Sequence, residues 1–208
     1  MKKLLESVVA AAMVAAFAPA TFAADADAAA SAPEKETATV GKPAPAWKDL
    51  AGTDDKSHSL SDLKDAKAVA VVFTCNHCPV AKAYEDRLVE FAADYADKGV
   101  ELVAINVNNM EADRLPAMKE RAEEKGFEFA YLYDPSQQIG RDFGATVTPH
   151  AFLLDGERNI VYIGAIDDNP NPEKVTTHHL RDAADAVLAG SKPQVDTTKP
   201  VGCGIRYE

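Results

Sequence analysis

Apolar runs and helical periodicity alternate along the central part of the chain. Ala68 to Phe73 is a continuous apolar run, which predicts a central strand covered on both faces. From Val80 to Lys98 apolar side chains recur at helical spacing between charged ones, and Gly99 ends this predicted helix. Val100 to Asn106 predicts the next strand. Together these segments predict a β–α–β unit, and therefore two parallel strands joined by a right-handed crossover.

The flanking segments carry weaker patterns of the same kind. A short helical turn is expected over 59–63, with Ser59 or Ser61 as its cap, and Trp47 is expected to cover the edge of the core. Asp155-Gly156 is a hairpin turn signal. Further helices are expected over 111–125, 137–143 and 175–188, and extended segments over 127–133, 151–154 and 160–165.

Two of the three cysteines stand where the predicted strand passes into the predicted helix. The sequence there is Thr74-Cys75-Asn76-His77-Cys78-Pro79. Two thiols separated by two residues in this setting are typical of a redox pair. The free N–H groups and dipole of a helix N-terminus favour a thiolate, so we expect Cys75 to have a lowered pKa and to be the more exposed nucleophile. Cys78, one turn further in, would resolve the mixed disulfide that Cys75 forms with a substrate.

These features resemble those of a known family. The Cys75 to Pro79 motif, Thr148-Pro149 before a strand, and the closing hairpin and helix are similar to exported thioredoxin-like proteins of the redoxin (AhpC/TSA-related) group. The resemblance runs from about Val40 to Gly190, and Gly202-Cys203-Gly204-Ile205 is similar to an ending in one branch of that group. It implies an α/β thioredoxin-like fold, with a central mixed sheet flanked by helices and an αβ segment inserted between the CxxC and a cis-proline.

The resemblance also implies roles for the neighbours of the thiols. Pro149 would be the cis-proline that faces the cysteines, with Thr148 before it. His150 would then lie close to the site, either as a proton handler or as an ordinary strand side chain. Asn76 and His77 would tune the pair, because a positive His77 would stabilise the thiolate and make the disulfide a stronger oxidant. A solvated loop side chain is an equally good interpretation of His77.

The site also departs from the usual thioredoxin pattern. Thr74 stands where those proteins have tryptophan, and no proline separates the cysteines. The preceding strand, 68–73, is wholly apolar, so it offers no counterpart of the buried acid that assists proton transfer. Lys82, one turn into the helix, is expected to be a solvated side chain. These departures leave the redox potential and the direction of electron flow open.

Cys203 is the third thiol, near the C-terminus. It could pair with Cys75 or Cys78, bridge to a partner, or remain a buried, unreactive thiol, and we favour the last interpretation. The glycines on either side of it predict a fixed turn rather than a loose tail. His178 and His179 are expected at the surface rather than as ligands, and no metal site is predicted.

The N-terminus has the pattern of an export signal. Lys2 and Lys3 precede an apolar, alanine-rich run, and Thr21-Phe22-Ala23 provides the small residues that a signal peptidase recognises. We expect a signal peptide over 1–23, a flexible linker over 24–39, a thioredoxin-like domain over 40–190, and a tail over 191–208. The protein would then work in the periplasm or outside the cell, without stable membrane insertion. Such compartments are oxidising, so paired cysteines can persist there as disulfides.

Three functions are compatible with this sequence. The leading hypothesis is a cofactor-free thiol–disulfide oxidoreductase that acts on protein or small-molecule thiols and disulfides and has a redox partner protein. A peroxiredoxin-like, antioxidant thiol peroxidase is less well supported, because the Pro-x-x-x-Thr-x-x-Cys frame of those enzymes is absent. A Sco-like copper-binding chaperone would suit soft thiolates, but those proteins separate their cysteines by three residues. The net charge of −11 makes nucleic acid an improbable partner.

Overall fold

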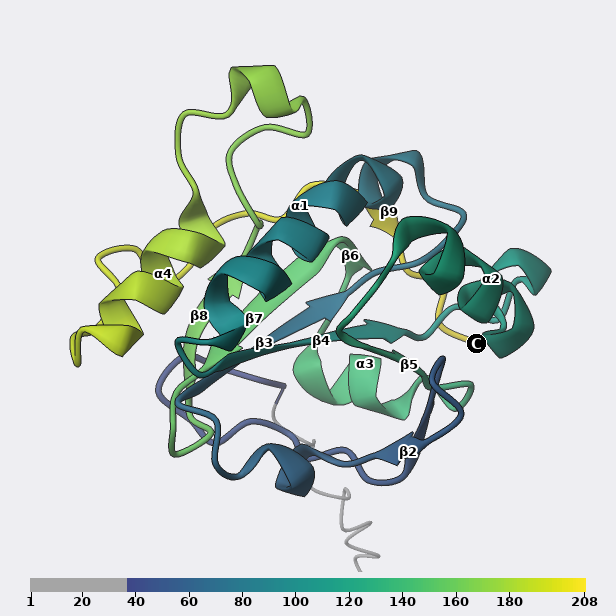
Figure 1. Cartoon of the computed structure of the whole chain (residues 1–208), viewed down its shortest axis with the longest axis horizontal. Helices are drawn as coiled ribbons and strands as arrows, with labels where there is room; N and C mark the ends of the chain where they lie inside the picture. Colours follow the sequence, from purple (N-terminus) through teal and green to yellow (C-terminus); the bar gives the residue numbers. More distant parts are fainter. Residues whose placement is uncertain (1–36) are drawn as a thin grey trace, which may run out of the picture. The chain divides into compact units, whose positions relative to one another are not determined.

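The computed structural model describes residues 37–208 (Figure 1). The expected signal peptide and most of the expected linker lie outside the described residues. Within residues 37–208 no helix has both the length and the apolar character needed to cross a membrane. The strands are β1 (Leu50–Gly52), β2 (Ser57–His58), β3 (Ala68–Phe73), β4 (Val100–Asn106), β5 (Ala130–Tyr133), β6 (Val147–Thr148), β7 (His150–Leu154), β8 (Ile160–Gly164) and β9 (Cys203–Gly204). The helices are α1 (Pro79–Ala96), α2 (Leu115–Lys125), α3 (Gln138–Phe143) and α4 (His179–Leu188), with short 3-10 turns at Leu60–Leu63, Glu111–Asp113 and Pro172–Lys174.

Seven strands form one mixed sheet in the order β2-β1-β5-β4-β3-β7-β8. The strands β3, β4 and β5 are parallel, whereas β7 and β8 on one side and β1 and β2 on the other run antiparallel to their neighbours. Ala68 pairs with Val100 and Phe73 with Ile105, so β3 and β4 end side by side. The loops that follow these two strands therefore leave the same edge of the sheet. The mixed, thioredoxin-like α/β architecture expected from the sequence is confirmed.

The alternation along β3 divides the core between the two faces of the sheet. Ala68, Ala70 and Val72 pack toward α1 and α4, which lie on one face (Figure 1). Val69, Val71 and Phe73 point to the other face, where they share a cluster with residues of α3. Every residue of β3 is buried, as the continuous apolar run predicts.

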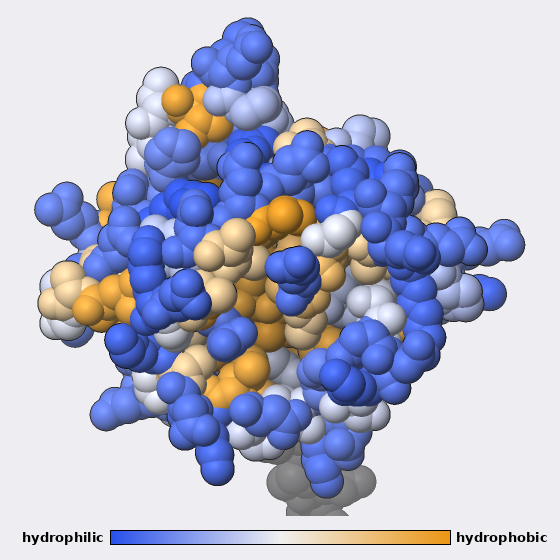
Figure 2. All heavy atoms as spheres, viewed as in Figure 1, coloured by the Kyte–Doolittle hydropathy of each residue, from blue (hydrophilic) through white to orange (hydrophobic). Residues whose placement is uncertain are grey.

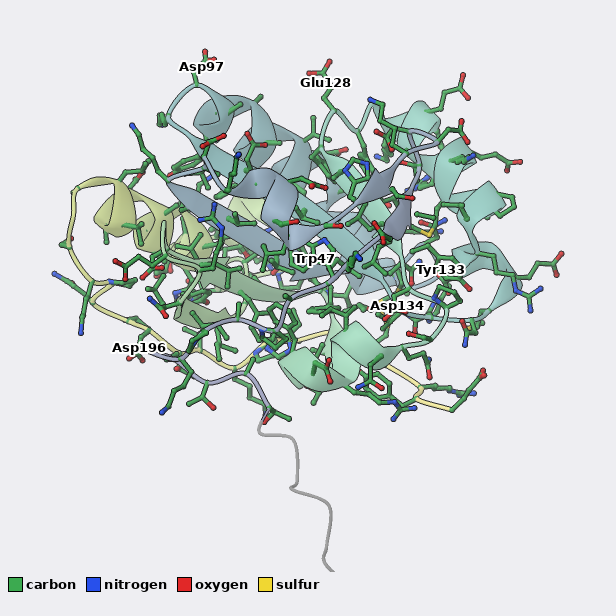
Figure 3. All side chains as sticks on the ribbon, turned by 90° about the horizontal axis from the view of Figure 1, so that it is seen from below. Trp47, Asp97, Glu128, Tyr133, Asp134 and Asp196 are labelled. Carbon is green, nitrogen blue, oxygen red and sulfur yellow. A yellow bond between two sulfur atoms is a disulfide. The ribbon has the colours of Figure 1, made fainter. Side chains whose placement is uncertain are left out.

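Trp47 belongs to the core on the α3 side of the sheet. Its side chain is 4% exposed and lies among other side chains in the interior (Figure 3). The expected cap of the first turn is also found, because Ser59 and Asp62 form a reciprocal capping box around Leu60–Leu63.

Two of the expected helices are shorter in the structure. The segment 111–125 is a 3-10 turn followed by α2, because Pro116 lacks an N–H and its ring would clash with the carbonyl of the preceding turn. The segment 175–188 becomes helical only at His179. The β-branched residues before it have low helix propensity, and Asp168 holds Thr176 in an extended loop by accepting hydrogen bonds from its backbone N–H and its hydroxyl.

A second, two-stranded sheet was not expected from the sequence. Strand β9 in the tail pairs antiparallel with β6, placing Cys203 opposite Thr148 and Gly204 opposite Val147. In Figure 1 the yellow C-terminal segment passes from α4 behind α1 to reach β9. The segment around Cys203 is fixed, as expected, but it is a strand rather than the expected turn.

Both ends of the tail are anchored to the domain. Upstream of β9, the Thr198 hydroxyl lies 2.6 Å from the Tyr162 hydroxyl and accepts a hydrogen bond from the Ala165 N–H. Downstream, the Tyr207 hydroxyl donates to the Ala145 carbonyl at 2.6 Å.

The surface of the face shown in Figure 2 is mostly hydrophilic, with apolar atoms gathered near its centre.

Candidate functional site

The two central cysteines lie in the turn between β3 and α1. Cys78 is the N-cap residue of α1, with Pro79 at the first helical position, and its sulfur accepts a hydrogen bond from the Ala81 N–H at 3.4 Å. Cys75 lies outside the helix, three residues before its cap. The sequence placed Cys75 at the helix end and Cys78 one turn inward, whereas in the structure Cys78 is at the helix end and Cys75 precedes the helix. The reason is that Pro79, which suits the first helical position, fixes where the helix starts.

The disulfide in this structure joins Cys78 to Cys203 rather than to Cys75. The two Cα atoms are 5.9 Å apart, and the bond closes a sequence separation of 125 residues. Cys75 is the free thiol. Our interpretation of Cys203 as an unreactive thiol was therefore wrong, because the pairing of β9 with β6 carries its side chain to the redox pair.

Cys75 is buried and is not activated in this state. Its side chain is 2% exposed, so it is not the exposed thiol that the sequence suggested. Burial raises the pKa of the Cys75 thiol, and the nearby Asp113 carboxylate raises it further. The Thr148 hydroxyl and the backbone N–H groups of Cys78 and His77 act in the opposite direction without offsetting burial. The expected lowering of the Cys75 pKa is therefore wrong for this disulfide state.

Asp113 is a functional candidate that sequence reasoning missed. It is fully buried, and its carboxylate accepts hydrogen bonds from the N–H groups of Asn76 at 2.7 Å and His77 at 3.2 Å. The other carboxylate oxygen lies 2.5 Å from His77 Nδ1. Asp113 thus fixes the backbone between the two cysteines and orients His77. It follows β4, and the available signal was that β3 and β4 end at the same edge of the sheet.

His77 is therefore more than a solvated loop side chain. Its ring is 27% exposed and is held by the buried carboxylate of Asp113. Although β3 carries no acid, a buried carboxylate from a different loop therefore lies beside the turn that holds the cysteines. Lys82, in contrast, is exposed, as expected.

Asn76 ties the same turn to the sheet. Its amide donates to the Ala112 carbonyl at 2.9 Å, and its side-chain oxygen accepts from the Tyr131 hydroxyl at 2.9 Å. Asn106 at the end of β4 donates to the Asp113 carbonyl at 3.2 Å. Buried polar groups that are satisfied in this way give the turn a single arrangement. Thr74, also buried, donates its N–H to the Ile105 carbonyl at 3.0 Å.

Thr148 and Pro149 face the cysteines from the opposite strand. The Thr148–Pro149 peptide bond is cis, as expected. The Thr148 hydroxyl lies 3.1 Å from the Cys75 sulfur, and the Thr148 carbonyl oxygen lies 3.3 Å from the Cys78 sulfur. Because Cys78 is in a disulfide it has no proton to donate, so the second contact is close packing rather than a hydrogen bond.

His150 lies on β7, inside the sheet. It is 6% exposed, its ring centroid is 4.6 Å from that of Phe152, and neither ring nitrogen has a hydrogen-bond partner. Burial lowers the pKa of His150 to about 4, so the ring is neutral at neutral pH. This environment suits a core side chain better than a proton handler.

Cys75, His77 and Asp113 also form a group of potential metal ligands. One ligating atom from each lies within 4.8 Å of the others. Ligand atoms around a tetrahedral zinc ion are separated by about 3.3 Å or more, given bonds of roughly 2.0–2.3 Å. The 2.5 Å contact between His77 and Asp113 is shorter than that, so a metal would have to part these two side chains.

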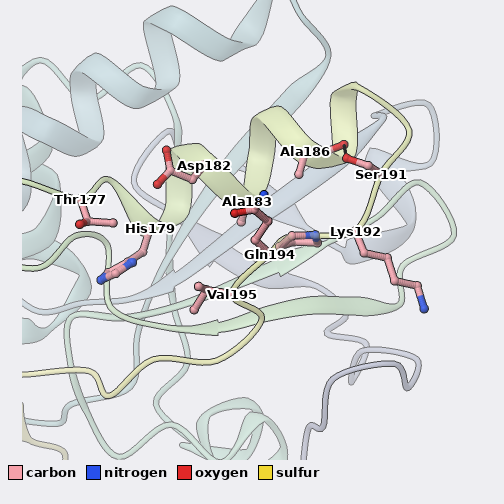
Figure 4. A pocket seen from close by; sticks show the side chains of 10 residues that line it. Thr177, His179, Asp182, Ala183, Ala186, Ser191, Lys192, Gln194 and Val195 are labelled. Carbon is pink, nitrogen blue, oxygen red and sulfur yellow. Dashed lines mark hydrogen bonds between the residues drawn. The ribbon is translucent and has the colours of Figure 1, made fainter.

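Two cavities border the C-terminal tail. One of about 400 Å³ lies between α4 and the start of the tail, and it contains neither cysteine nor Pro149 (Figure 4). A smaller one of about 270 Å³ is lined by Pro149 and by the tail residues Lys199 and Val201. The second cavity is therefore the one adjacent to the redox centre.

The fold and the site together define a class of protein. A CxxC at the start of α1, a cis-proline facing it and a mixed sheet beneath are the features of a thioredoxin-like thiol–disulfide oxidoreductase.

Comparisons with known proteins agree with this class. The Redoxin family model matches residues 39–180, and the chain belongs to this family. The chain is 30% identical over 135 residues to the thiol:disulfide interchange protein DsbE of Yersinia pestis, an alignment that covers 64% of this chain and 68% of that protein. An uncharacterized conserved protein from Geobacillus kaustophilus has a similar structure, with a TM-score of 0.77, 37% identity, and coverage of 82% of this chain and 93% of that one.

More distant structures share the fold. The thioredoxin domain of a thiol-disulfide oxidoreductase from Bacteroides vulgatus aligns with a TM-score of 0.53 at 22% identity, covering 61% of this chain and 89% of that one. The thioredoxin-like oxidoreductase expected from the sequence is thus confirmed at the level of family and fold.

Proposed function

We propose that this oxidoreductase is an exported enzyme in which Cys75 is the nucleophile and Cys78 the resolving thiol. The observation that carries the proposal is the placement of Cys75, 3.1 Å from the Thr148 hydroxyl, beside Pro149 and next to the helix cap formed by Cys78. A substrate cysteine brought to this edge would meet both thiols. The partners would be protein or small-molecule thiols and disulfides, together with a protein that restores the redox state.

The exchange follows from the two sulfurs. The Cys75 thiolate attacks a substrate disulfide and releases one substrate thiol, which leaves a mixed disulfide at Cys75. Cys78 then attacks the Cys75 sulfur, releases the second substrate thiol, and completes a Cys75–Cys78 disulfide. Asp113 and His77 would act as positioning residues, because they hold the turn between the thiols and can take up the proton that Cys75 loses.

The test is trapping of the mixed disulfide with a disulfide-bonded peptide. The Cys78→Ser variant should accumulate a covalent peptide adduct at Cys75, detected by mass spectrometry, whereas Cys75→Ser should neither form that adduct nor turn over. Lys82→Ala, an exposed change on the same helix, should behave as wild type. Full turnover by Cys75→Ser would refute the assigned roles.

The two alternative functions predict different outcomes in the same preparation. A thiol peroxidase would consume hydrogen peroxide and convert Cys75 to a sulfenic acid, which a sulfenic-acid probe detects. A copper chaperone would bind Cu(I) through the reduced cysteines and a histidine, for which the sequence offers His150 and the structure places His77 nearby. We expect little of either activity, since Cys75 is buried with a raised pKa and His77 is already bound to Asp113.

Export is part of the proposal and rests on the N-terminal pattern, together with the similarity to DsbE. Expressed from its full sequence in a bacterium with two membranes, the protein should be recovered from the periplasm. Its mass should correspond to a chain that begins at Ala24. Recovery of the intact chain from the cytosol would contradict this localisation.

A further inference from the structure

The tail occupies the edge of the redox centre. Strand β9 lies antiparallel to β6, so that Cys203 is opposite Thr148, the residue before Pro149. The Ile205 N–H donates to the Thr146 carbonyl at 2.9 Å and extends this pairing. An extended peptide that added a strand to β6 would have to take the same place. The tail thus lies where a polypeptide substrate would have to bind to reach the thiols.

The approach of this segment is too close for any other residue at position 202. A Cβ atom on Gly202 would lie 2.0 Å from the Thr148 carbonyl oxygen and 3.2 Å from the Pro149 nitrogen. On the other side of the cysteine, a Cβ atom on Gly204 would meet nothing within 4 Å. The close approach of β9 to Thr148 therefore requires glycine at position 202 but does not require it at position 204.

We propose that Cys203 is a third redox-active cysteine, and that the segment 202–205 is an intramolecular substrate which closes the site by forming the Cys78–Cys203 disulfide. This inference rests on the proposed function of the Cys75/Cys78 pair. It adds a second oxidised form, in which Cys78 is not available to resolve a mixed disulfide at Cys75. In that form the strand-pairing edge is also occupied, so the enzyme is closed to polypeptide substrates.

The two oxidised forms interconvert without an external oxidant. The Cys75 thiol loses its proton through the neighbouring His77 and Asp113 side chains, and its thiolate attacks the Cys78 sulfur. A Cys75–Cys78 bond forms as the Cys78–Cys203 bond breaks, and Cys203 leaves as a thiolate that takes a proton from solvent. One disulfide and one thiol are present before and after, so no electrons are gained or lost.

The surroundings of the tail fit an exchangeable strand. Cys203 packs against the small cluster formed by Cys75, Cys78 and Ala81, so its removal uncovers the thiols. Anchors at Thr198 and Tyr207 hold the ends of the tail, so the segment between them can move without releasing the rest. Val201 is 63% exposed beside the cavity of about 270 Å³, which offers an apolar contact to an incoming polypeptide.

The geometry also specifies the substrate that would compete with the tail. It is an extended polypeptide that presents a cysteine preceded by glycine, because that is the pair of residues the edge accommodates in this structure. A small-molecule thiol would not need to displace the tail by strand pairing. The proposal therefore favours a protein partner.

The experiment maps the disulfide in the full chain. The reduced protein is treated with one equivalent of oxidised glutathione, quenched with acid, alkylated, and digested with trypsin. Cys75 and Cys78 fall on one peptide, 68–82, and Cys203 on another, 182–206. In the wild type we expect the two peptides to be linked and the alkyl group to be on Cys75.

A matched pair of variants tests the role of the strand. Gly202→Ala should shift the ratio of oxidised forms by about tenfold or more toward Cys75–Cys78, with Cys203 alkylated, because the added methyl overpacks against Thr148. Gly204→Ala, in the same strand, should keep the wild-type ratio. Circular dichroism checks that both variants are folded. As a second measurement, Cys75→Ser combined with Gly202→Ala should form the Cys78–Cys203 bond more slowly than Cys75→Ser alone.

The outcomes separate this inference from the proposed function, because the mapping requires no turnover. A wild-type chain that yields only Cys75–Cys78 with alkylated Cys203 would overturn the inference and leave the oxidoreductase proposal intact. Equal ratios in the Gly202→Ala and Gly204→Ala variants would also overturn it. Failure of Cys75 to form the peptide adduct described above would overturn the proposed function alone.

Discussion

The stability of the protein should depend on which disulfide it contains. In the chain-entropy account, a disulfide stabilises the folded state by restricting the unfolded chain, and the effect grows with the length of the closed loop. The Cys78–Cys203 bond closes a loop with a sequence separation of 125 residues, which corresponds to about 5 kcal/mol of unfolding free energy. A Cys75–Cys78 bond closes a loop of only a few residues, for which the same relation gives about 2 kcal/mol.

The assay is urea unfolding of the oxidised and reduced protein at pH 7, followed by circular dichroism. For the wild type we expect reduction to lower the free energy of unfolding by about 5 kcal/mol. The folded state changes little on reduction, because the tail remains anchored through the Tyr207 hydroxyl and through Glu208, whose N–H donates to the Gln137 side chain at 2.7 Å.

Two variants provide the controls for this measurement. Cys75→Ser retains both partners of the long-range disulfide, so reduction should cost it about as much as it costs the wild type. Cys203→Ser can form only the short loop, so its loss on reduction should fall to about 2 kcal/mol. If the wild type and Cys203→Ser lose the same free energy on reduction, the reasoning is refuted, because the long loop would then contribute nothing.

Three further perturbations test the surroundings of the site and the core. Burial lowers the pKa of His150 from 6.5 to about 4 in the folded protein, so between these pH values the unfolded chain binds this proton and the folded protein does not. The free energy of unfolding should therefore fall by about 3 kcal/mol as the pH drops from 6.5 to 4. In urea unfolding at the two pH values, His150→Phe should remove this loss. The Asp113→Asn variant removes a negative charge that raises the pKa of Cys75, so iodoacetamide should alkylate that thiol at a lower pH than in the wild type. The exposed Glu111→Gln change in the same turn should leave this pH dependence unchanged. Arg121→Met removes the cation closest to the buried Glu85 carboxylate and leaves a second cationic side chain 3.8 Å from it. The change should lower the free energy of unfolding by about 2–3 kcal/mol.

The strongly patterned parts of the fold were predictable from sequence. Strands β3 and β4 and helix α1 appear where the sequence predicted them. A continuous apolar run is typical of a strand buried on both faces, and apolar residues at helical spacing are typical of a helix buried on one face. The helix limits were less predictable where local chemistry competes with periodicity. Pro116 divides one expected helix, and the hydrogen bonds of Asp168 to Thr176 delay the start of another.

The candidate site was predictable only as far as it is local in sequence. Cys75 and Cys78 could be identified from their spacing and setting, whereas Pro149 was identified through the resemblance to thioredoxin-like proteins. Asp113 could not, because its role depends on two loops that meet only after β3 and β4 have paired in register. The partner of Cys203 depends on an even longer connection, since two-residue strands such as β6 and β9 have no periodicity to recognise.

The state of Cys75 is easier to understand when the tail is considered as part of the site. A buried thiol with a raised pKa reacts slowly, and it would be a poor nucleophile for an enzyme that always kept this form. Cys203 contributes to the cover of the cysteine cluster while it also occupies the sulfur that would resolve a mixed disulfide. Once the Cys75 thiolate displaces Cys203 from Cys78, β9 is no longer held covalently, and its departure would uncover the new Cys75–Cys78 disulfide. This coupling protects an oxidised thiol enzyme from unspecific exchange until a polypeptide competes for β6.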